Sequence, residues 1–398
     1  MPAPVLLTAL LMVFLAFDGL IAAAESPKAP VKVGVILPLT GNEARFALIE
    51  KNSFLMGLDE INAAGGVKGR QIELVIEDNL SEVSVARTAV QKLVAQDNVV
   101  VLTGGYSSEL TFAICAFAQH KRVPFLVNTA IADRITEQGW NYVFRLATPA
   151  SEYPNALISF LKDVAKPKTA AIIYPSNQYG ETASRKFREY CKRIRIKVSF
   201  ERDYKSGEAD FTTYLSQVKE LKPDLVYMVA HLTDAIALMN KARDVDLNAK
   251  LFVGGSPAFA ISEFGREAGE ASENVFATTP WTPTVTYPGA KQYYERYLKR
   301  FSTPPEYHGA QAYASMYVIA DALQRAEELA PQAVREALTK TDMMTAFGPV
   351  KFIDYGRKKQ QNSVPTYVVQ WQKGKLETVW PRGVADKLYI FPVPAWQK

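Results

Sequence analysis

Short apolar runs alternate with helix-like segments along most of this 398-residue chain. Each run has the length of a buried strand, and the segments between the runs repeat apolar residues every three or four positions, as amphipathic helices do. Alternation at this spacing is typical of parallel sheets covered by helices on both faces. The pattern therefore predicts an α/β protein with doubly wound parallel sheets.

The alternation occurs in two successive series, separated near residue 149. The first series predicts strands and helices at 31–37, 43–63, 71–77, 83–96, 99–103, 108–121 and 124–127. The second predicts helices and strands at 151–164, 168–174, 179–193, 196–204, 211–221, 224–229, 233–244 and 250–254. Two series of this kind indicate two lobes.

The last third of the chain predicts three helices and then three strands, at 288–302, 308–327, 331–340, 349–353, 364–371 and 376–380. The helices have little sheet of their own, so we expect them to pack on the first lobe. The expected division is a first lobe of residues 31–148 with 279–353 and a second lobe of residues 149–278 with 354–398. A multi-strand hinge between them suits closure around a ligand.

An apolar run at residues 5–17 predicts an export signal. It has the length of a signal-peptide core and is too short to span a bilayer. Small residues at Ala22, Ala23 and Ala24 suit cleavage, so residues 1–24 are expected to be removed. Because no basic residue precedes the run and Asp18 interrupts its end, a membrane anchor or a misassigned start stays open as the alternative.

Charge and cysteine content exclude several functions. The net charge is +5, and removal of residues 1–24 deletes one acid and no base, which gives +6. The basic residues are dispersed, which argues against a nucleic-acid partner. Cys115 and Cys191 fall in different predicted lobes and are expected to be free, and neither has metal-ligand spacing. We expect no metal and no cofactor.

A glycine-rich loop before the helix at 108–121 is the best candidate for binding chemistry. It reads Thr103-Gly104-Gly105-Tyr106-Ser107-Ser108. Glycines let a ligand approach the backbone, and N–H groups at a helix start attract anions. The hydroxyls of Ser107 and Ser108 can donate to a carboxylate, although an ordinary helix cap is the alternative interpretation.

The opening of the chain resembles the type I periplasmic binding proteins, in particular the branched-chain amino-acid binding group. The resemblance begins with Val31-Lys32-Val33-Gly34-Val35-Ile36-Leu37-Pro38-Leu39-Thr40-Gly41 and Glu60-Ile61-Asn62-Ala63-Ala64-Gly65-Gly66-Val67-Lys68-Gly69-Arg70, and covers roughly residues 31–380. It implies the periplasmic, monomeric receptor of an ABC importer, which closes on a small ligand and then meets the membrane permease subunits.

The resemblance also implies roles for two loops of the first lobe. In that group the loop with Ser107 and Ser108 grips the ligand carboxylate. The next loop usually reads Ser/Thr-Pro-Ala-Ala-Thr, whereas this chain has Asn128-Thr129-Ala130-Ile131-Ala132. The Ala130 carbonyl would accept from a ligand ammonium, but a carboxylate-binding threonine is missing or replaced by Asn128 or Thr129.

In the second lobe, the segment before Gly180 resembles the family's Asp-X-X-Tyr-Gly loop, which places Tyr179 over the ligand; a tyrosine within the core is the alternative. His231 stands where relatives often have a tyrosine. Ser256 stands where amino-acid binders have the acid that pairs with an ammonium, and Glu263 would replace that acid only in a shifted register.

The expected ligand-binding residues are therefore Phe46, Ser107, Ser108, Asn128, Thr129, Ala130, Tyr179, His231, Ser256 and His308. They include no carboxylate for an ammonium, which favours a small carboxylate such as an aromatic acid, with a hydrophobic or branched-chain amino acid as the other option. A ligand-sensing receptor module of the same fold, for amides or amino acids, is the alternative function. No enzyme is expected, because nucleophile-elbow, phosphate-loop and dinucleotide motifs are absent.

Overall fold

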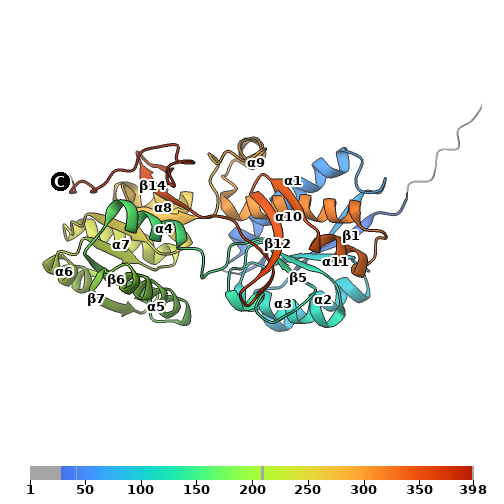
Figure 1. Ribbon diagram of the computed structural model, residues 1–398, viewed down its shortest axis with the longest axis horizontal. Coiled ribbons are helices and arrows are strands. Elements are labelled where there is room, and N and C mark those ends of the chain that lie inside the picture. The colour runs from blue at the N-terminus through green and yellow to red at the C-terminus, as the bar shows by residue number, and fades with distance from the viewer. Residues whose placement is uncertain (1–27, 42, 208–209, 397–398) are drawn as a thin grey trace, which may run out of the picture.

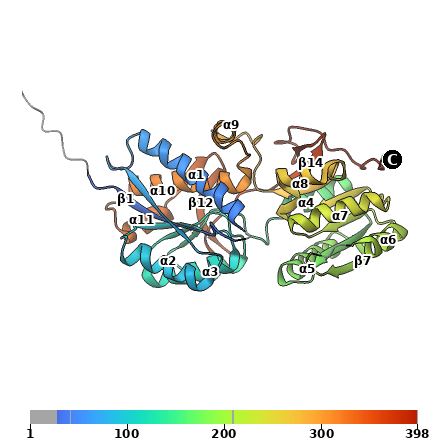
Figure 2. The same ribbon diagram turned by 180° about the vertical axis from the view of Figure 1, so that it is seen from behind.

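The computed structural model describes residues 28–41, 43–207 and 210–396. The expected signal peptide at residues 1–24 lies outside this part of the chain. The chain forms two α/β lobes that lie side by side along the long axis of the molecule (Figure 1). Figure 2 shows the same division from behind.

Lobe 1 contains a sheet of eight strands in the order β11-β12-β13-β5-β4-β3-β1-β2. The strands are β1 (Val31–Leu37), β2 (Ile72–Asp78), β3 (Val101–Gly104), β4 (Phe125–Val127), β5 (Val143–Arg145), β11 (Asp342–Thr345), β12 (Gly348–Tyr355) and β13 (Lys358–Asn362). β1 to β5 pair in parallel, and β12 is antiparallel to both of its neighbours.

Helices bury an apolar face on each side of this sheet, as the sequence pattern predicted. One side is covered by α1 (Ala44–Ala63), α9 (Ala290–Phe301), α10 (Glu306–Arg325) and α11 (Pro331–Thr339). The other side is covered by α2 (Val83–Ala95) and α3 (Ser108–Lys121). The late helices therefore pack on lobe 1, where α10 lies against α1, far away in sequence.

Lobe 2 contains a sheet of seven strands in the order β15-β14-β10-β9-β8-β6-β7. The strands are β6 (Thr169–Pro175), β7 (Lys197–Tyr204), β8 (Leu225–Met228), β9 (Leu251–Gly254), β10 (Phe276–Thr279), β14 (Tyr367–Gln372) and β15 (Lys375–Trp380). One face packs on α4 (Asn155–Phe160) and α5 (Gln178–Arg193), and the other on α6 (Thr212–Leu221), α7 (Leu232–Asp244) and α8 (Ser262–Ala268). The prediction of two doubly wound lobes is confirmed.

The described chain passes between the two sheets three times, after β5, after β10 and after β13. Because β13 pairs with β5 and β12 in the lobe 1 sheet, the last passage lies at residues 363–366. The sequence-based division had placed it at residue 353. Three connections between the same lobes favour a hinge motion over independent drift.

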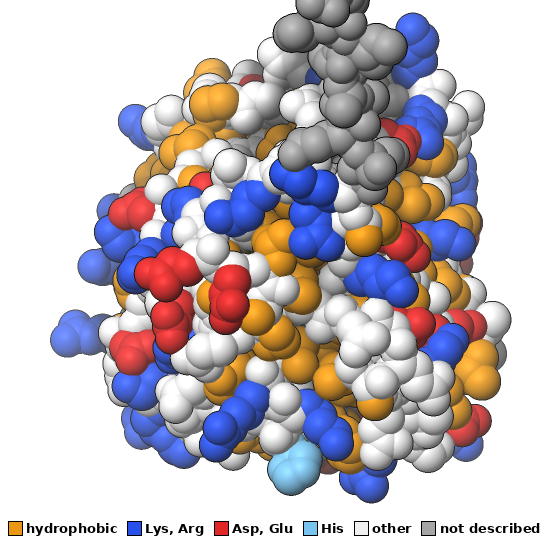
Figure 3. All heavy atoms as spheres, turned by 90° about the vertical axis from the view of Figure 1, so that its right-hand side faces the viewer, with side chains coloured by type: hydrophobic (Ala, Val, Ile, Leu, Met, Phe, Trp, Pro, Cys, Tyr) orange, Lys and Arg blue, Asp and Glu red, His pale blue; other side chains and the backbone are white. Residues whose placement is uncertain are grey.

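The surface at the outer end of lobe 1 mixes the two signs of charge. Figure 3 shows Lys and Arg side chains interspersed with Asp, Glu and apolar side chains on this face.

Cys115 and Cys191 are both buried and free. Within the described ranges, no helix combines the length and apolar character needed to cross a bilayer, and no cluster of His, Cys, Asp and Glu suits a metal ion.

Candidate ligand-binding cleft

A cavity of about 240 Å³ lies between the lobes, where the carboxyl ends of both sheets meet; we call it the cleft. Lobe 1 lines it with Phe46, Tyr106, Ser108, Thr129, Ile131, Tyr307 and His308. Lobe 2 lines it with Tyr179, Ala230, His231, Leu232, Ser256, Pro257, Ala258 and Ile261. Open α/β sheets bind their ligands at this edge.

The glycine pair after β3 brings the start of α3 to the cleft. Gly104 has φ +113°, and a Cβ there would lie 2.3 Å from the carbonyl oxygen of Ile36. Gly105 has φ +91°, and its Cβ would meet the side chain of Thr111. Only glycine fits both positions, so the tight turn that presents Ser107 and Ser108 depends on this dipeptide.

The two serines are placed for an anion. Ser107 is the N-cap of α3, but its side chain makes no capping hydrogen bond. Ser108 Oγ accepts from the backbone N–H of Ala132 at 3.2 Å, so its hydroxyl hydrogen stays available to a ligand. Together with the N–H groups of the first turn of α3, these hydroxyls form a site suited to a carboxylate.

The loop after β4 is fastened to a buried acid. Glu50 of α1 is fully buried, and its carboxylate accepts from Asn128 Nδ2 at 2.9 Å and from Thr129 Oγ1 at 2.6 Å. Burial raises the pKa of Glu50 to about 7, against the opposing effect of these two hydrogen bonds. A negative charge can therefore form directly behind the cleft wall.

Aromatic rings form the wall beside this loop. Phe46 stacks on Tyr106 with ring centroids 5.3 Å apart, and its centroid lies 4.7 Å from that of His308. Burial lowers the pKa of His308 to about 3, with a smaller effect in the same direction from Arg45. The imidazole is thus neutral at physiological pH, and this side of the cleft can hold a flat or apolar ligand body.

Lobe 2 closes the cleft with fewer polar groups. Tyr179 keeps 38% of its surface exposed, and the centroid of its ring lies 5.6 Å from that of His231. Ser256 Oγ donates to the carbonyl of Ala230 at 2.7 Å and accepts from the N–H of the same residue at 3.3 Å. The Ser256 hydroxyl therefore joins the loops after β8 and β9.

Polar contacts hold the lobes together around the cleft. Arg45 of lobe 1 forms an ion pair with Glu263 of α8. Glu306, at the start of α10, accepts from the backbone N–H of Ser262 at 3.0 Å. Both contacts join lobe 1 to the start of α8, at the adjacent residues Ser262 and Glu263.

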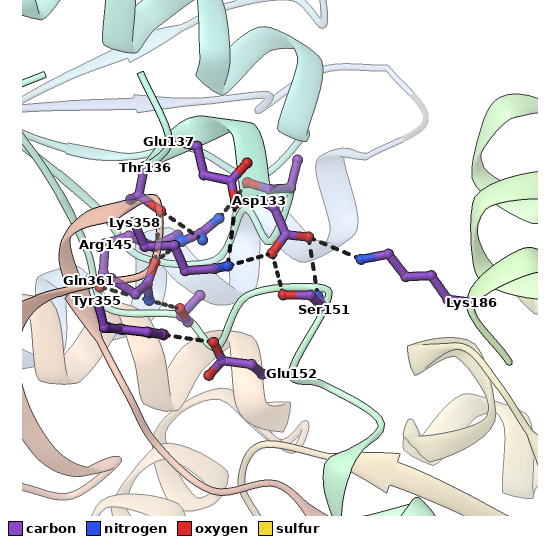
Figure 4. A network of polar contacts seen from close by, with 12 residues as sticks. Asp133, Thr136, Glu137, Arg145, Ser151, Glu152, Lys186, Tyr355, Lys358 and Gln361 are labelled. Atoms are coloured by element: carbon purple, nitrogen blue, oxygen red, sulfur yellow. Dashed lines mark hydrogen bonds and ion pairs between the residues drawn. The ribbon is translucent and has the colours of Figure 1, made fainter. Parts of the chain in front are cut away.

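A third contact lies near the hinge and is shown in Figure 4. Asp133 pairs with Lys186 of α5 at 3.3 Å and with Lys358 of β13 at 3.2 Å. Burial alone would raise the pKa of Asp133, but the hydrogen bond from Ser151 and the two lysines hold it below its usual value. Asp133 directly follows the loop 128–132, so this contact connects the cleft wall to lobe 2.

Comparison with known proteins shows the family to which the chain belongs. The sequence pattern of the periplasmic binding proteins matches residues 30–375. The chain belongs to the periplasmic binding protein family. As expected from the sequence, the family is the type I group and is made up of solute-binding proteins, not enzymes.

Individual relatives agree with this assignment. The chain is 26% identical to the Leu/Ile/Val-binding protein homolog 7 of Brucella suis biovar 1 (strain 1330), covering 94% of this chain and 97% of that protein. It is similar to the branched-chain amino acid transporter substrate-binding protein LivJ from Streptococcus pneumoniae, solved with isoleucine (TM-score 0.77, 25% identity, 88% and 100% covered). It also shares its fold with an R. palustris solute-binding protein solved with benzoate (TM-score 0.73, 19% identity, 88% and 95% covered).

In this periplasmic binding protein, seven of the ten residues expected at the site line the cleft: Phe46, Ser108, Thr129, Tyr179, His231, Ser256 and His308. The other three lie beside it. Ser107 caps α3, Asn128 is buried against Glu50, and the N–H of Ala130 donates to the Gly105 carbonyl at 2.9 Å. The roles of all ten remain predictions.

Sequence reasoning missed Glu50 and Tyr106. Glu50 follows Phe46 by four residues and precedes Phe54 by four, so it lies on the buried face of α1. An acid within an apolar helical stripe was the signal that could have revealed it. Tyr106 was part of the glycine-rich loop, but its ring position depends on the turn at Gly104 and Gly105.

A larger cavity of about 460 Å³ lies elsewhere between the lobes, beside the passage after β10. Its lining includes Trp281, Tyr294, Glu306, Trp371 and Glu377. It shares only Tyr307 with the cleft and contains neither the start of α3 nor the loop after β4. The cleft has the start of α3 and the loop after β4, whereas the larger cavity has Lys375, Glu306 and Glu377 beside its aromatic rings.

Proposed function

We propose that this protein is the solute-binding receptor of an ABC importer and captures a small carboxylate by closure of its lobes. The observation that carries the proposal is the start of α3, where Ser107 is the N-cap and Ser108 lines a cleft walled by Phe46 and Tyr106. Helix-start N–H groups and hydroxyls suit the carboxylate, and the rings suit an apolar body. Aromatic acids and hydrophobic or branched-chain amino acids fit this description.

The proposal includes the setting of the protein. Residues 1–24 act as an export signal cleaved near Ala24, the mature chain is a periplasmic monomer, and the closed form is recognised by membrane permease subunits. Support comes from family membership and from ligands named for similar structures, which are isoleucine and benzoate. Neither a cofactor nor a nucleic acid takes part.

Calorimetry with purified protein tests the proposal. Branched-chain amino acids, aromatic amino acids, benzoate and hydroxybenzoates are titrated, and mass spectrometry of a denatured sample identifies any ligand that purifies with the protein. We expect at least one carboxylate to bind with micromolar or tighter affinity. Its amide or ester is expected not to bind. Binding that persists after the carboxylate is blocked would contradict the proposal.

A further inference from the structure

The hydrogen bonds of Glu50 determine the polarity of the cleft wall. A hydroxyl has one hydrogen, and Thr129 Oγ1 donates it to Glu50 Oε1 at 2.6 Å. Thr129 Oγ1 meanwhile accepts from Asn128 Nδ2 at 2.8 Å, which also fixes the direction of the hydroxyl hydrogen. An ionised carboxylate only accepts, so the Thr129 oxygen can offer a ligand nothing but a lone pair.

Ser108, on the adjoining loop, has the opposite polarity. Its oxygen accepts from the Ala132 N–H, and its hydrogen is free to donate. The two loops follow neighbouring strands and are joined by the Asn128 N–H, which donates to the Gly104 carbonyl at 3.1 Å. Neighbouring strands lie about 4.8 Å apart, so one small ligand can meet a donor and an acceptor side by side.

The side-chain amide of Asn128 has a fixed orientation. The Oδ1 atom of Asn128 is buried and has no hydrogen-bond partner among the described residues. Asn128 cannot turn this oxygen toward Glu50 without placing it against a carboxylate oxygen. Because Asn128 is fully buried and does not line the cleft, its amide acts on a ligand only through Thr129, whose oxygen accepts from Asn128 Nδ2.

We propose that Glu50 is a specificity-determining residue that acts through Thr129, so that the cleft selects carboxylates with a hydrogen-bond donor beside the carboxylate over analogues without one. This inference rests on the proposed function and narrows its ligand class. An ammonium and a hydroxyl share the required chemistry. A C–H group at the same place leaves the Thr129 lone pair desolvated and unpaired.

Matched ligands test the inference. Leucine, 2-hydroxy-4-methylpentanoate and 4-methylpentanoate share a carbon skeleton and differ only in the ammonium, hydroxyl or hydrogen beside the carboxylate; 2-hydroxybenzoate and benzoate form the aromatic pair. Binding is measured by calorimetry at about pH 8, above the pKa of Glu50 of about 7, so that its carboxyl is ionised. In at least one series the donor-bearing member is expected to bind about tenfold or more tightly than the donor-free member.

Three variants test whether Glu50 and Thr129 cause this ratio, which is the dissociation constant of the donor-free ligand divided by that of the donor-bearing ligand. Thr129→Val keeps the side-chain shape and removes the oxygen, and Glu50→Gln keeps the size but cannot accept from both partners. Both are expected to reduce the ratio to about threefold or less. Thr129→Ser restores the oxygen and is expected to restore the ratio. Thr88→Val, on the exposed side of α2, is the matched control.

The ratio, rather than the affinity, separates a role in selectivity from a structural role. If Glu50→Gln does not fold, the comparison of Thr129→Val with Thr129→Ser still decides. Equal binding of donor-bearing and donor-free ligands by the natural protein, or an unchanged ratio in Thr129→Val, would overturn the inference alone. If no carboxylate of either series binds, the proposed function is contradicted as well.

Discussion

The guanidinium of Arg45 in lobe 1 pairs with the carboxylate of Glu263 in lobe 2 at the edge of the cleft. Arg45 also lies 5.4 Å above the ring of Phe46, which lines the cleft. Because Arg45 and Glu263 belong to different lobes, their contact exists only when the lobes are close. The ion pair therefore stabilises the closed form relative to an open one.

Arg45→Gln is expected to weaken ligand binding about two- to fivefold, because a partly exposed ion pair contributes up to about 1 kcal/mol. The loss should appear in the dissociation rate, measured by stopped-flow fluorescence, since closure follows encounter. High salt should reduce the difference.

Arg266→Gln is the matched control for this prediction. Arg266 also approaches Glu263, at 3.6 Å, but both residues lie on α8. Its loss should leave the dissociation rate unchanged. Equal effects of the two arginine variants would show that the contact between lobes has no special role.

Ser108→Ala is expected to reduce affinity for the carboxylate about tenfold, because the variant removes a hydroxyl that donates to a charged group. Ser256→Ala is the informative comparison, because the Ser256 hydroxyl exchanges two hydrogen bonds with the backbone of Ala230. It should lower the melting temperature and change affinity less than Ser108→Ala does. Calorimetry and thermal unfolding of both variants check this, and the reverse order of affinities would contradict it.

The sequence predicted the lobes well because their long strands and helices have strong periodicity. It missed β5, β10, β11 and β13, which are three to five residues long. β13 reads Lys-Lys-Gln-Gln-Asn and has no apolar residue, yet Gln360, Gln361 and Asn362 are buried. Their amides bond to the backbone of lobe 1, for example Gln361 Nε2 to the Ala147 carbonyl at 2.8 Å. Such burial depends on tertiary partners that no local pattern reveals.

The cleft was likewise predictable only in part. Loops after parallel strands could be placed at one edge from the sequence alone, and this brought Ser108, Thr129, Tyr179 and Ser256 together. What the side chains do there depends on partners far away in sequence, since Thr129 bonds to Glu50 and Ser256 bonds to Ala230. Arg45 and Glu263 lie far apart in the sequence, and only the folded chain pairs them.

Arg145 is the buried cation that supports the cleft loop. It is fully buried, and it donates to the Ala132 carbonyl and to Gln361 Oε1, both at 2.6 Å, and to Thr136 Oγ1 at 3.1 Å (Figure 4). Lysine cannot reproduce this fork, so Arg145→Lys should lower the free energy of unfolding by about 2–4 kcal/mol. Urea unfolding measures the loss. Arg185→Lys, at an exposed position of α5, is the control, and a comparable small change in both would contradict the prediction.

Glu50 makes the stability of the protein depend on pH in an unusual direction. Its pKa is raised from 4.5 to about 7, chiefly by burial, so the folded state binds its proton more tightly than the unfolded state does. The stability from this group is fully present below about pH 4.5 and is lost as the pH rises through about 7. Over that window the natural protein should lose about 3 kcal/mol relative to Glu50→Gln.

His308 changes the pH dependence of stability in the opposite direction, so variants of both residues must be compared. Its pKa is lowered from 6.5 to about 3, so protonation of the unfolded state destabilises the fold as the pH falls through this range. The two groups partly cancel between about pH 4.5 and 6.5 in the natural protein. Unfolding free energies of the natural protein, Glu50→Gln and His308→Gln across about pH 4 to 8 separate them. A difference between the natural protein and Glu50→Gln that does not vary with pH would show that Glu50 titrates normally, and so that its carboxyl is not held in the buried site behind Thr129.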